Sequence, residues 1–336
     1  MSVAPAPPAR PGLVRRALRW TVPALLIAVA LGVWQRERLW LGYCAERLER
    51  APDDQRPMWA DKLAAAGEPA VPTLLALLRH DDPGVCTAAK GGLEHLVNDW
   101  PADDPRRLAF ARTFVEAEPR FSTPGRSAAL DLLPTVVATG DAEVAQRAKG
   151  MIATAARSES AELRVQAVAT ALMPGVDALE TIVPLIGDPE AGVRRAAILA
   201  LGPVRDGQSA VLSDDDLLHC LHDSDGEVRR LCEMCLRGRG RSARDIQLGR
   251  RYTAPNPAER QKLLIDLSDE DNLDVTVWLE RLTADPDPAV RAGAARVAVE
   301  RKADLYARLD QMSRTDPDGT VRRIAEFYKK KMQATR

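Results

Sequence analysis

From about residue 50 onward, apolar positions recur at helical spacings, and short polar turns interrupt them at regular intervals. The clearest copy is Asp188–Gly202, which follows the apolar segment Ile182–Ile186. Within it Val193, Ala197 and Leu201 recur at spacings of four, which places them on one helical face. The pattern predicts the end of one helix, a tight Asp-Pro turn and a second helix that packs back on the first.

Similar turns recur along the chain. The clear copies lie at residues 82–86, 160–164, 188–194, 223–229, 285–291 and 316–322. Their apolar anchors from Leu163 onward are separated by 30 to 35 residues, or by about twice that interval between Val228 and Val290. Two weaker turns, Ser122–Arg126 and Pro255–Arg260, fill the longer gaps. A fixed period in this range is typical of helical repeat arrays and predicts about eight hairpins.

The turn residues have local roles that explain their recurrence. Asp or Ser can cap the helix that follows the turn and accept its free N–H groups. Proline suits the first helical turn, where the missing N–H is not needed. Gly202 fits a helix C-cap, with Pro203 just beyond.

The pattern Leu-Leu-x-x-Leu, Asp-Pro, Val-Arg, Ala-Ala, Ala-Leu-Gly resembles the HEAT-repeat family, in particular its short bacterial form. The resemblance covers most of Glu68–Met332 and is poor around residues 106–139 and 242–271. It implies an all-α fold, a right-handed α-solenoid of about eight helical hairpins, and the uncharged run at residues 20–34 separately predicts a single transmembrane helix before it. The predicted domains are a disordered tail at residues 1–16, a transmembrane helix at 17–41 and a repeat domain at 42–336.

The resemblance also implies a ladder in which turn aspartates pair with arginines of neighbouring repeats. Cys86 replaces the arginine of the first clear unit, so the ladder is expected to fail there. Asp188, Asp223, Asp285 and Asp316 would pair with arginines drawn from Arg164, Arg194, Arg229, Arg291 and Arg322. The predicted structural turn residues are Asp82, Asp188, Arg194, Asp223, Arg229, Asp285, Arg291, Asp316 and Arg322.

Composition agrees with close-packed helices. The 336-residue chain is 46% apolar but only 4% aromatic, which favours helices over sheets. Its formal net charge of −1 argues against a general nucleic-acid-binding protein, whose footprint is usually strongly basic. We therefore expect no nucleic acid among the partners.

The N-terminus carries a candidate membrane anchor. Residues 20–34 contain no charge, and Trp20 and Trp34 stand at the two ends, as interfacial aromatic residues do. Trp40 and Tyr43 could extend the contact along the membrane surface. A cleaved signal peptide, with Ala28-Val29-Ala30 as the small-residue site, and a buried helix of a soluble domain are the alternatives. Arginines 10, 15, 16 and 19 precede the span and arginines 36, 38, 47 and 50 follow it. Because the first group lies tighter to the span, we expect a single-pass protein with its repeat domain outside the cytoplasm.

Two His and three Cys lie within one stretch and could supply zinc ligands. They are His219, Cys220, His222, Cys232 and Cys235. Aligned to the clearest copy, Cys232 and Cys235 replace Ala197 and Ala200, so we interpret them as buried core residues and predict no metal. A disulfide between Cys220 and either Cys232 or Cys235 is a further alternative if the domain is extracytoplasmic.

Other polar runs have simpler interpretations. Ser213–Asp216 is expected to cap a helix, and Arg237–Arg241 is expected to be a solvated basic linker. The sequence contains no Gly-rich phosphate loop and no recognisable nucleophile or metalloprotease motif. We therefore expect a scaffold without a cofactor that binds unknown protein partners. The resemblance leaves open a bilin lyase, a DNA glycosylase or an accessory subunit of a membrane complex.

Overall fold

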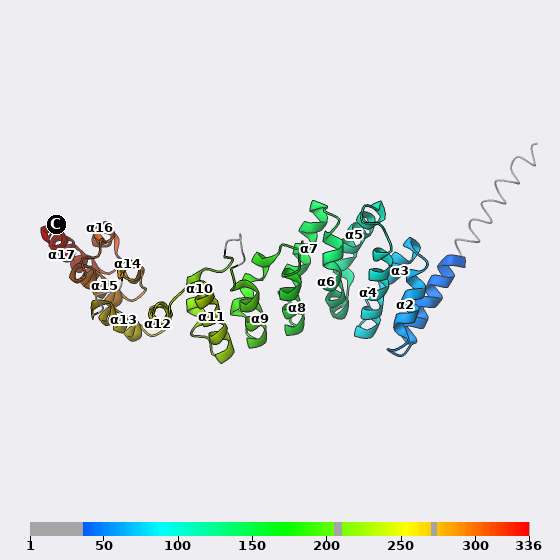
Figure 1. Ribbon diagram of the computed structural model, residues 1–336, viewed down its shortest axis with the longest axis horizontal. Coiled ribbons are helices and arrows are strands. Elements are labelled where there is room, and N and C mark those ends of the chain that lie inside the picture. The colour runs from blue at the N-terminus through cyan, green and yellow to red at the C-terminus, as the bar shows by residue number, and fades with distance from the viewer. Residues whose placement is uncertain (1–35, 205–209, 270–273, 336) are drawn as a thin grey trace, which may run out of the picture. The chain divides into compact units, whose positions relative to one another are not determined.

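The computed structural model of the chain describes residues 36–204, 210–269 and 274–335, and every regular element in these ranges is a helix (Figure 1). The chain divides into two compact units. Unit 1 comprises residues 1–155 and 173–177, and unit 2 comprises residues 156–172 and 178–336. The sequence predicted a single repeat domain and gave no sign of this division.

In unit 1, residues 36–50 are helical and precede a succession of short helices. These are α2 (Arg56–Ala64), η1 (Glu68–Ala70), α3 (Val71–Leu77), α4 (Pro83–Asn98), α5 (Pro105–Ala117), η2 (Glu118–Arg120), α6 (Thr123–Val137) and α7 (Ala142–Ala155). The helix α4 packs between α2 and α6, so successive elements stack in chain order.

Unit 2 continues with helices joined by the predicted turns. They are α8 (Ala161–Ala171), η3 (Leu179–Gly187), α9 (Ala191–Leu201), α10 (Asp214–Cys220), α11 (Gly226–Gly238), α12 (Ala243–Tyr252), α13 (Pro257–Asp269), α14 (Thr276–Leu282), α15 (Pro288–Glu300), α16 (Tyr306–Thr315) and α17 (Gly319–Thr335). We call α8, α9, α11, α13, α15 and α17 the second helices, because each follows one of the turns. All eight turns identified in the sequence lie between two helices.

The second helices pack directly on one another. α8 contacts α9 and α9 contacts α11; farther along, α13 contacts α15 and α15 contacts α17. Their facing positions are small or aliphatic, as with Ala197, Cys232, Leu263 and Ala325, all fully buried. Small side chains at these positions allow the close helix approach that the alanine-rich sequence predicted.

The fourth hairpin departs from the expected pair of α-helices. Its first helix, η3, is a 3₁₀ helix that contains Pro184 and buries Ile182 and Leu185. A proline inside an α-helix has no N–H to donate and its ring clashes with the preceding turn. The tighter helix still turns Ile182 and Leu185 toward α8 and α9.

The predicted tail and most of the predicted transmembrane helix, residues 1–35, lie outside the described residues. Residues 36–41, the end of that predicted helix, are helical and continue into residues 42–50. None of the helices in the described part of the chain combines the length and apolar character needed to cross a membrane.

Candidate functional site

A ladder of ion pairs, three of them buried and one half-buried, runs along unit 2. Arg164, Arg194, Arg260 and Arg291 each reach the next turn and hold an aspartate through two nitrogens. Their partners are Asp188, Asp223, Asp285 and Asp316, at nitrogen–oxygen distances of 2.7–3.0 Å. Such paired N–H···O bonds fix both distance and orientation. The ladder therefore sets the register of successive hairpins.

Each ladder arginine is also fixed to its own turn. The Nη1 atom of Arg291 donates to the carbonyl oxygens of Asp285 and Pro286, at 2.8 and 3.0 Å. Arg194 makes the same two contacts with Asp188 and Pro189. One guanidinium thus hydrogen-bonds the carbonyl oxygens of its own turn and the carboxylate of the next turn.

The two aspartates of a turn have different roles, which the sequence interpretation did not separate. In the last hairpin, Asp318 is the N-cap and accepts from the N–H groups of Thr320 and Val321. Asp316, two residues earlier, accepts from Asp318 N–H and from Arg291. The first aspartate therefore joins hairpins, whereas the second starts the helix.

The ion pairs shift the acid–base equilibria of their members. Hydrogen bonds from Arg291 lower the pKa of Asp316, and burial opposes them. For Asp188 burial is the largest influence and raises the pKa, but the bonds from Arg164 and Glu190 N–H outweigh it and leave the pKa lowered. Both carboxylates are therefore held ionised.

Arg260 was missing from the predicted ladder, although its turn was identified. Its turn begins with Ala254 instead of an aspartate, so the sequence there looked degenerate. The arginine still occupies the ladder position, six residues after the start of the turn. That spacing is the signal that would have found it.

Ala254, in place of an aspartate, also interrupts the ladder between α11 and α13. Arg229 bonds the carbonyl oxygens of Asp223 and Ser224 like the other ladder arginines. The following turn offers Ala254 at the place of the aspartate. No close packing comparable to that of α13 and α15 joins α11 to α13. The gap in the ladder therefore coincides with a looser step in the stack.

In unit 1 the ladder fails at Cys86, as predicted. His80 stands where an aspartate would, and its Nδ1 accepts from Asp82 N–H at 3.0 Å. The Cys86 thiol contacts His80 O and lies 3.9 Å from Ser122 Oγ. Contacts of the Cys86 thiol thus stand where the ion pair would be. A separate pair, Arg56 with Asp82, joins α2 to the start of α4 at 2.6 Å and was not predicted.

The His and Cys residues considered as zinc ligands do not converge. His219 bonds Asp215 O and His222 bonds Arg250 O, each through a ring nitrogen. Cys220 and Cys232 do hydrogen-bond each other; this bond lowers the pKa of Cys220, and it raises that of Cys232 together with burial. Within the described ranges, no group of three or more His, Cys, Asp or Glu side chains is arranged to hold a metal ion.

The basic segment Arg237–Arg241 differs from the expected solvated linker. The side chain of the half-buried Arg239 is only 8% exposed and donates to the carbonyl oxygens of Gly202 and Leu212 and to Asp214. Arg241 reaches the other oxygen of Asp214 at 2.6 Å. Ser213 and Asp216 form a capping box at the start of α10, as the sequence predicted. Asp214 of the run Ser213–Asp216 therefore binds two arginines of the basic segment, Arg239 and Arg241.

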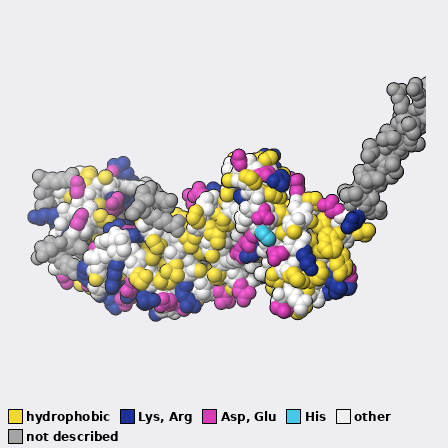
Figure 2. Space-filling view, turned by 45° about the vertical axis from the view of Figure 1, so that its right-hand side comes forward, with side chains coloured by type: hydrophobic (Ala, Val, Ile, Leu, Met, Phe, Trp, Pro, Cys, Tyr) yellow, Lys and Arg dark blue, Asp and Glu magenta, His cyan; other side chains and the backbone are white. Residues whose placement is uncertain are grey.

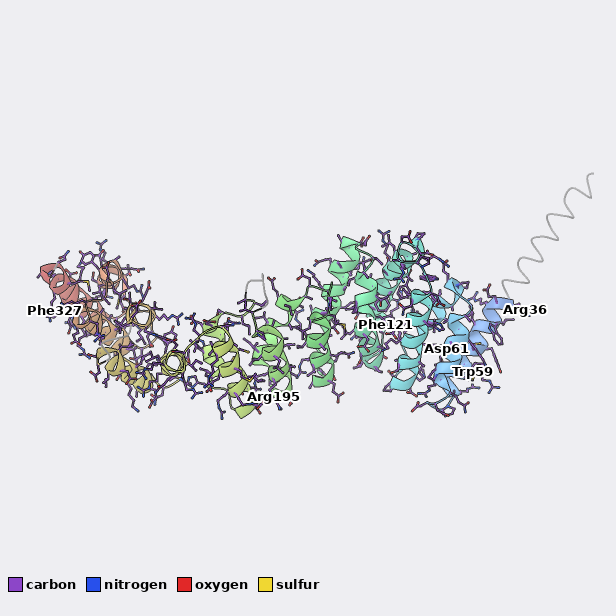
Figure 3. The ribbon with its side chains drawn as sticks, in the orientation of Figure 1. Arg36, Trp59, Asp61, Phe121, Arg195 and Phe327 are labelled. Carbon is purple, nitrogen blue, oxygen red and sulfur yellow. The ribbon has the colours of Figure 1, made fainter. Side chains whose placement is uncertain are left out.

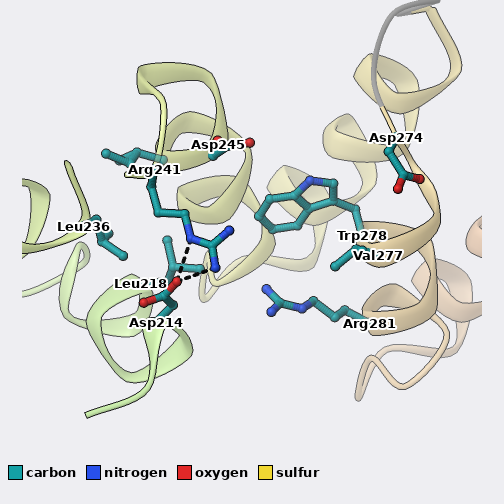
Figure 4. A pocket seen from close by; sticks show the side chains of 10 residues that line it. Asp214, Leu218, Leu236, Arg241, Asp245, Asp274, Val277, Trp278 and Arg281 are labelled. Carbon is teal, nitrogen blue, oxygen red and sulfur yellow. Dashed lines mark hydrogen bonds and ion pairs between the residues drawn. The ribbon is translucent and has the colours of Figure 1, made fainter. Parts of the chain in front are cut away.

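A pocket of about 250 Å³ lies among α10, α12 and α14 (Figure 4). Trp278, Val277 and Ile246 form its apolar part, and Arg281 lies beside the Trp278 ring at 5.4 Å from its centroid. Asp214 is held by arginines, and Asp245 belongs to the capping box of α12. Asp214 and Asp245 are thus already hydrogen-bonded within the protein. They form part of the pocket wall, and the pocket is suited to binding.

Unit 1 exposes an aromatic surface near its first described residues. We define the N-terminal aromatic surface as Leu39, Trp40, Tyr43, Met58 and Trp59; all but the half-buried Trp59 are exposed. Tyr43 stacks on Trp40 and meets the edge of Trp59, which Figure 3 labels on α2. The Lys62 ammonium lies 3.8 Å from the Trp59 ring centroid. Figure 2 shows hydrophobic side chains gathered at this end of the unit.

Comparison with known protein families identifies HEAT repeats over residues 148–237. The matched range contains the Arg164–Asp188 and Arg194–Asp223 pairs. No curated protein matches the chain. The all-α architecture of the described residues, with helices packed in sequence, is consistent with a HEAT-type solenoid.

Proposed function

We propose that this protein is a membrane-anchored HEAT-type scaffold that binds other proteins. HEAT repeats typically serve as protein-interaction scaffolds. The observation that carries the proposal is the ladder of Arg–Asp pairs, which holds successive second helices in register. Stacked hairpins present extended surfaces, and solenoids bind through such surfaces.

Binding is proposed in preference to catalysis because of how the polar groups are used. In the pocket among α10, α12 and α14, Asp214 and Asp245 are engaged by arginines or by a helix cap. The Arg–Asp ladder likewise uses its charges to join repeats. These groups contribute to structure, which leaves the exposed side chains of the helices for recognition.

The N-terminal aromatic surface supports the membrane part of the proposal. Aromatic residues with cationic neighbours are favoured at the boundary between lipid and water. Leu39, Trp40 and Tyr43 follow the uncharged run 20–34 by only a few residues. A chain anchored through that run would bring this surface to the headgroup region.

The test uses the full chain in native membranes. We expect it to remain in the membrane pellet after alkaline carbonate extraction, and chemical crosslinking should join it to specific protein partners. A matched variant, Leu26→Arg with Ile27→Arg, should move to the soluble fraction, whereas Leu199→Arg should not. Release of the unmodified chain by carbonate would refute the anchor, and the absence of specific crosslinks would refute the scaffold.

A further inference from the structure

Large, exposed apolar side chains recur at one register position of the second helices. Leu199, Met234, Ile265 and Phe327 each lie five residues after the ladder arginine of their helix. Their exposed fractions are 55%, 52%, 58% and 62%. We call these four residues the apolar row. On α15 the same position is Arg296, and on α8 it is Ala169.

Folding does not account for this row. The positions two residues earlier, such as Ala197 on α9 and Leu263 on α13, are the ones buried between neighbouring helices. The row remains more than half exposed on α9, although that helix has second helices packed on both sides. The row is therefore left accessible to solvent. The four residues share one register position, and exposed apolar residues that form a contiguous patch mark interaction surfaces.

At the C-terminal end the row meets a groove of about 520 Å³ between α15 and α17. Its aromatic and aliphatic lining comes from Ile324, Phe327 and Tyr328. On the α15 side, the small residues Ala292 and Gly293 leave the groove open. Phe327 on α17 and Arg195 on α9 are both exposed, and Figure 3 labels them. The groove is wide enough to receive side chains from an extended segment.

The charge around the groove is basic. Arg296 and Arg323 line it, and no Asp or Glu is among the described residues that line it. Arg296 pairs with Glu300 at 3.0 Å, and Arg323 donates to the Thr320 hydroxyl at 3.3 Å. Arg195, four residues before Leu199 on the same face, lies 3.9 Å from Asp225. Carboxylates of a ligand would complement these cations.

We propose that the apolar row and this groove bind an acidic segment of a partner protein, with Phe327 as the central apolar contact. The proposal rests on the scaffold function proposed above. Pairing of two copies through this face is disfavoured, because a symmetric interface centred on the groove would bring Arg296 and Arg323 of one copy near the same residues of the other. A row that extends over several helices fits an elongated segment better than a single compact contact.

The test places a photo-crosslinking amino acid in the full chain, in cells, at Ile265 or at Phe327. The control positions are Gln247 on α12 and Gln311 on α16, both exposed on first helices. We expect adducts at Ile265 and Phe327 that map to one acidic, apolar-containing segment of a partner protein. The control positions should not reach that segment.

Charge reversal then tests the groove. With the probe at Ile265, Arg323→Glu should reduce adduct formation about tenfold, as expected for a central interface residue. Arg314→Glu, an exposed arginine of α16, makes the same charge change outside the groove and should leave the yield unchanged.

The outcomes separate this inference from the scaffold function. Adducts to a second copy of this chain, to lipid or to a basic segment would overturn the inference. Partner adducts only at Gln247 or Gln311 would keep the scaffold function and remove this surface. An absence of protein adducts at all four positions, combined with an absence of specific partners in the crosslinking of the unmodified chain, would remove both.

Discussion

At the residue scale, the spacing of arginine and aspartate carries most of the fold information. The pairs Arg164–Asp188, Arg194–Asp223 and Arg291–Asp316 are present in the structure, as the family resemblance implied. The sequence interpretation missed Arg260 because its own turn lacks an aspartate. It missed the hydrogen bonds of Arg239 because the neighbours of this residue are glycine and arginine. Charge patterns along the sequence do not reveal which carbonyl oxygens a folded chain brings near a guanidinium.

The two aspartates of the last turn should contribute differently to stability. Replacing Asp316 with alanine leaves the buried Arg291 without its carboxylate, so we expect a loss of about 3 kcal/mol in the free energy of unfolding. Asp318→Ala removes only an N-cap and should cost about 1 kcal/mol. Urea unfolding followed by circular dichroism measures both. Equal losses would contradict the separation of roles.

The lowered pKa of Asp316 predicts acid sensitivity of defined sign. The folded pKa lies below the unfolded one, because Arg291 bonds the ionised carboxylate. This stabilisation is complete above the ordinary aspartate value of about 3.9. It is lost as pH falls through the lower folded value, since the unfolded chain takes up the proton first. Thermal unfolding at a series of pH values should show this decline, and Asp316→Asn should make the decline shallower than in the unmodified chain.

At the element scale, the turns were easier to predict than the helices they join. All eight turns lie between helices, because Asp, Ser and Pro have local roles there that do not depend on distant residues. The close approaches between helices depend on tertiary packing. Gly202 shows the difference: it is the predicted C-cap, but its φ of −69° is ordinary. A Cβ there would meet Cys235 Sγ at 2.4 Å, which is why glycine is needed.

Gly125 should be the least replaceable glycine of unit 1. A Cβ at this position in α6 would lie 1.7 Å from Leu78 O, and neither backbone can move freely. We expect Gly125→Ala to lower the free energy of unfolding by about 3 kcal/mol, the upper end of overpacking effects. Gly150→Ala, on α7 with no atom within 4 Å of the new Cβ, is the control and should stabilise by about 0.5–1 kcal/mol. Urea unfolding that gives both variants the same sign would refute the close approach.

The thiol pair between α10 and α11 should be oxidisable. Cys220 and Cys232 hydrogen-bond each other, and both are free thiols. With diamide as the oxidant, we expect a disulfide between them; each thiol loses a hydrogen, and diamide takes up two electrons and two protons. Mass spectrometry of the unreduced protein should show the loss of two hydrogens, and Cys232→Ala should abolish it. A link from Cys220 to Cys235 would show that the pairing is different.

At the scale of the whole molecule, the repeated helices could be predicted from the sequence, whereas the division into two units could not. A period of 30 to 35 residues indicates stacking wherever it occurs, so the described helices follow the expected order. The boundary near residue 155 falls between α7 and α8, although the turn Ser160–Arg164 in that segment looks like the others. Where a stack separates depends on the balance of side-chain contacts on either side, which a turn motif does not encode. The apolar row likewise became visible only when burial distinguished it from the core positions of the same helices.

The orientation of the chain in the membrane is the last prediction, and it follows from the arginines around the uncharged run 20–34. Arg15, Arg16 and Arg19 lie close before the run, and positive charges favour the cytoplasmic side. We therefore expect the repeat units outside the cytoplasm, so that alkaline phosphatase fused to the C-terminus of the full chain is active and a fused green fluorescent protein is dark. Replacing Arg15, Arg16 and Arg19 with glutamate should invert both signals. A bright fluorescent fusion of the unmodified chain would reverse the orientation, and it would place the Cys220–Cys232 pair in a reducing compartment where it stays as thiols.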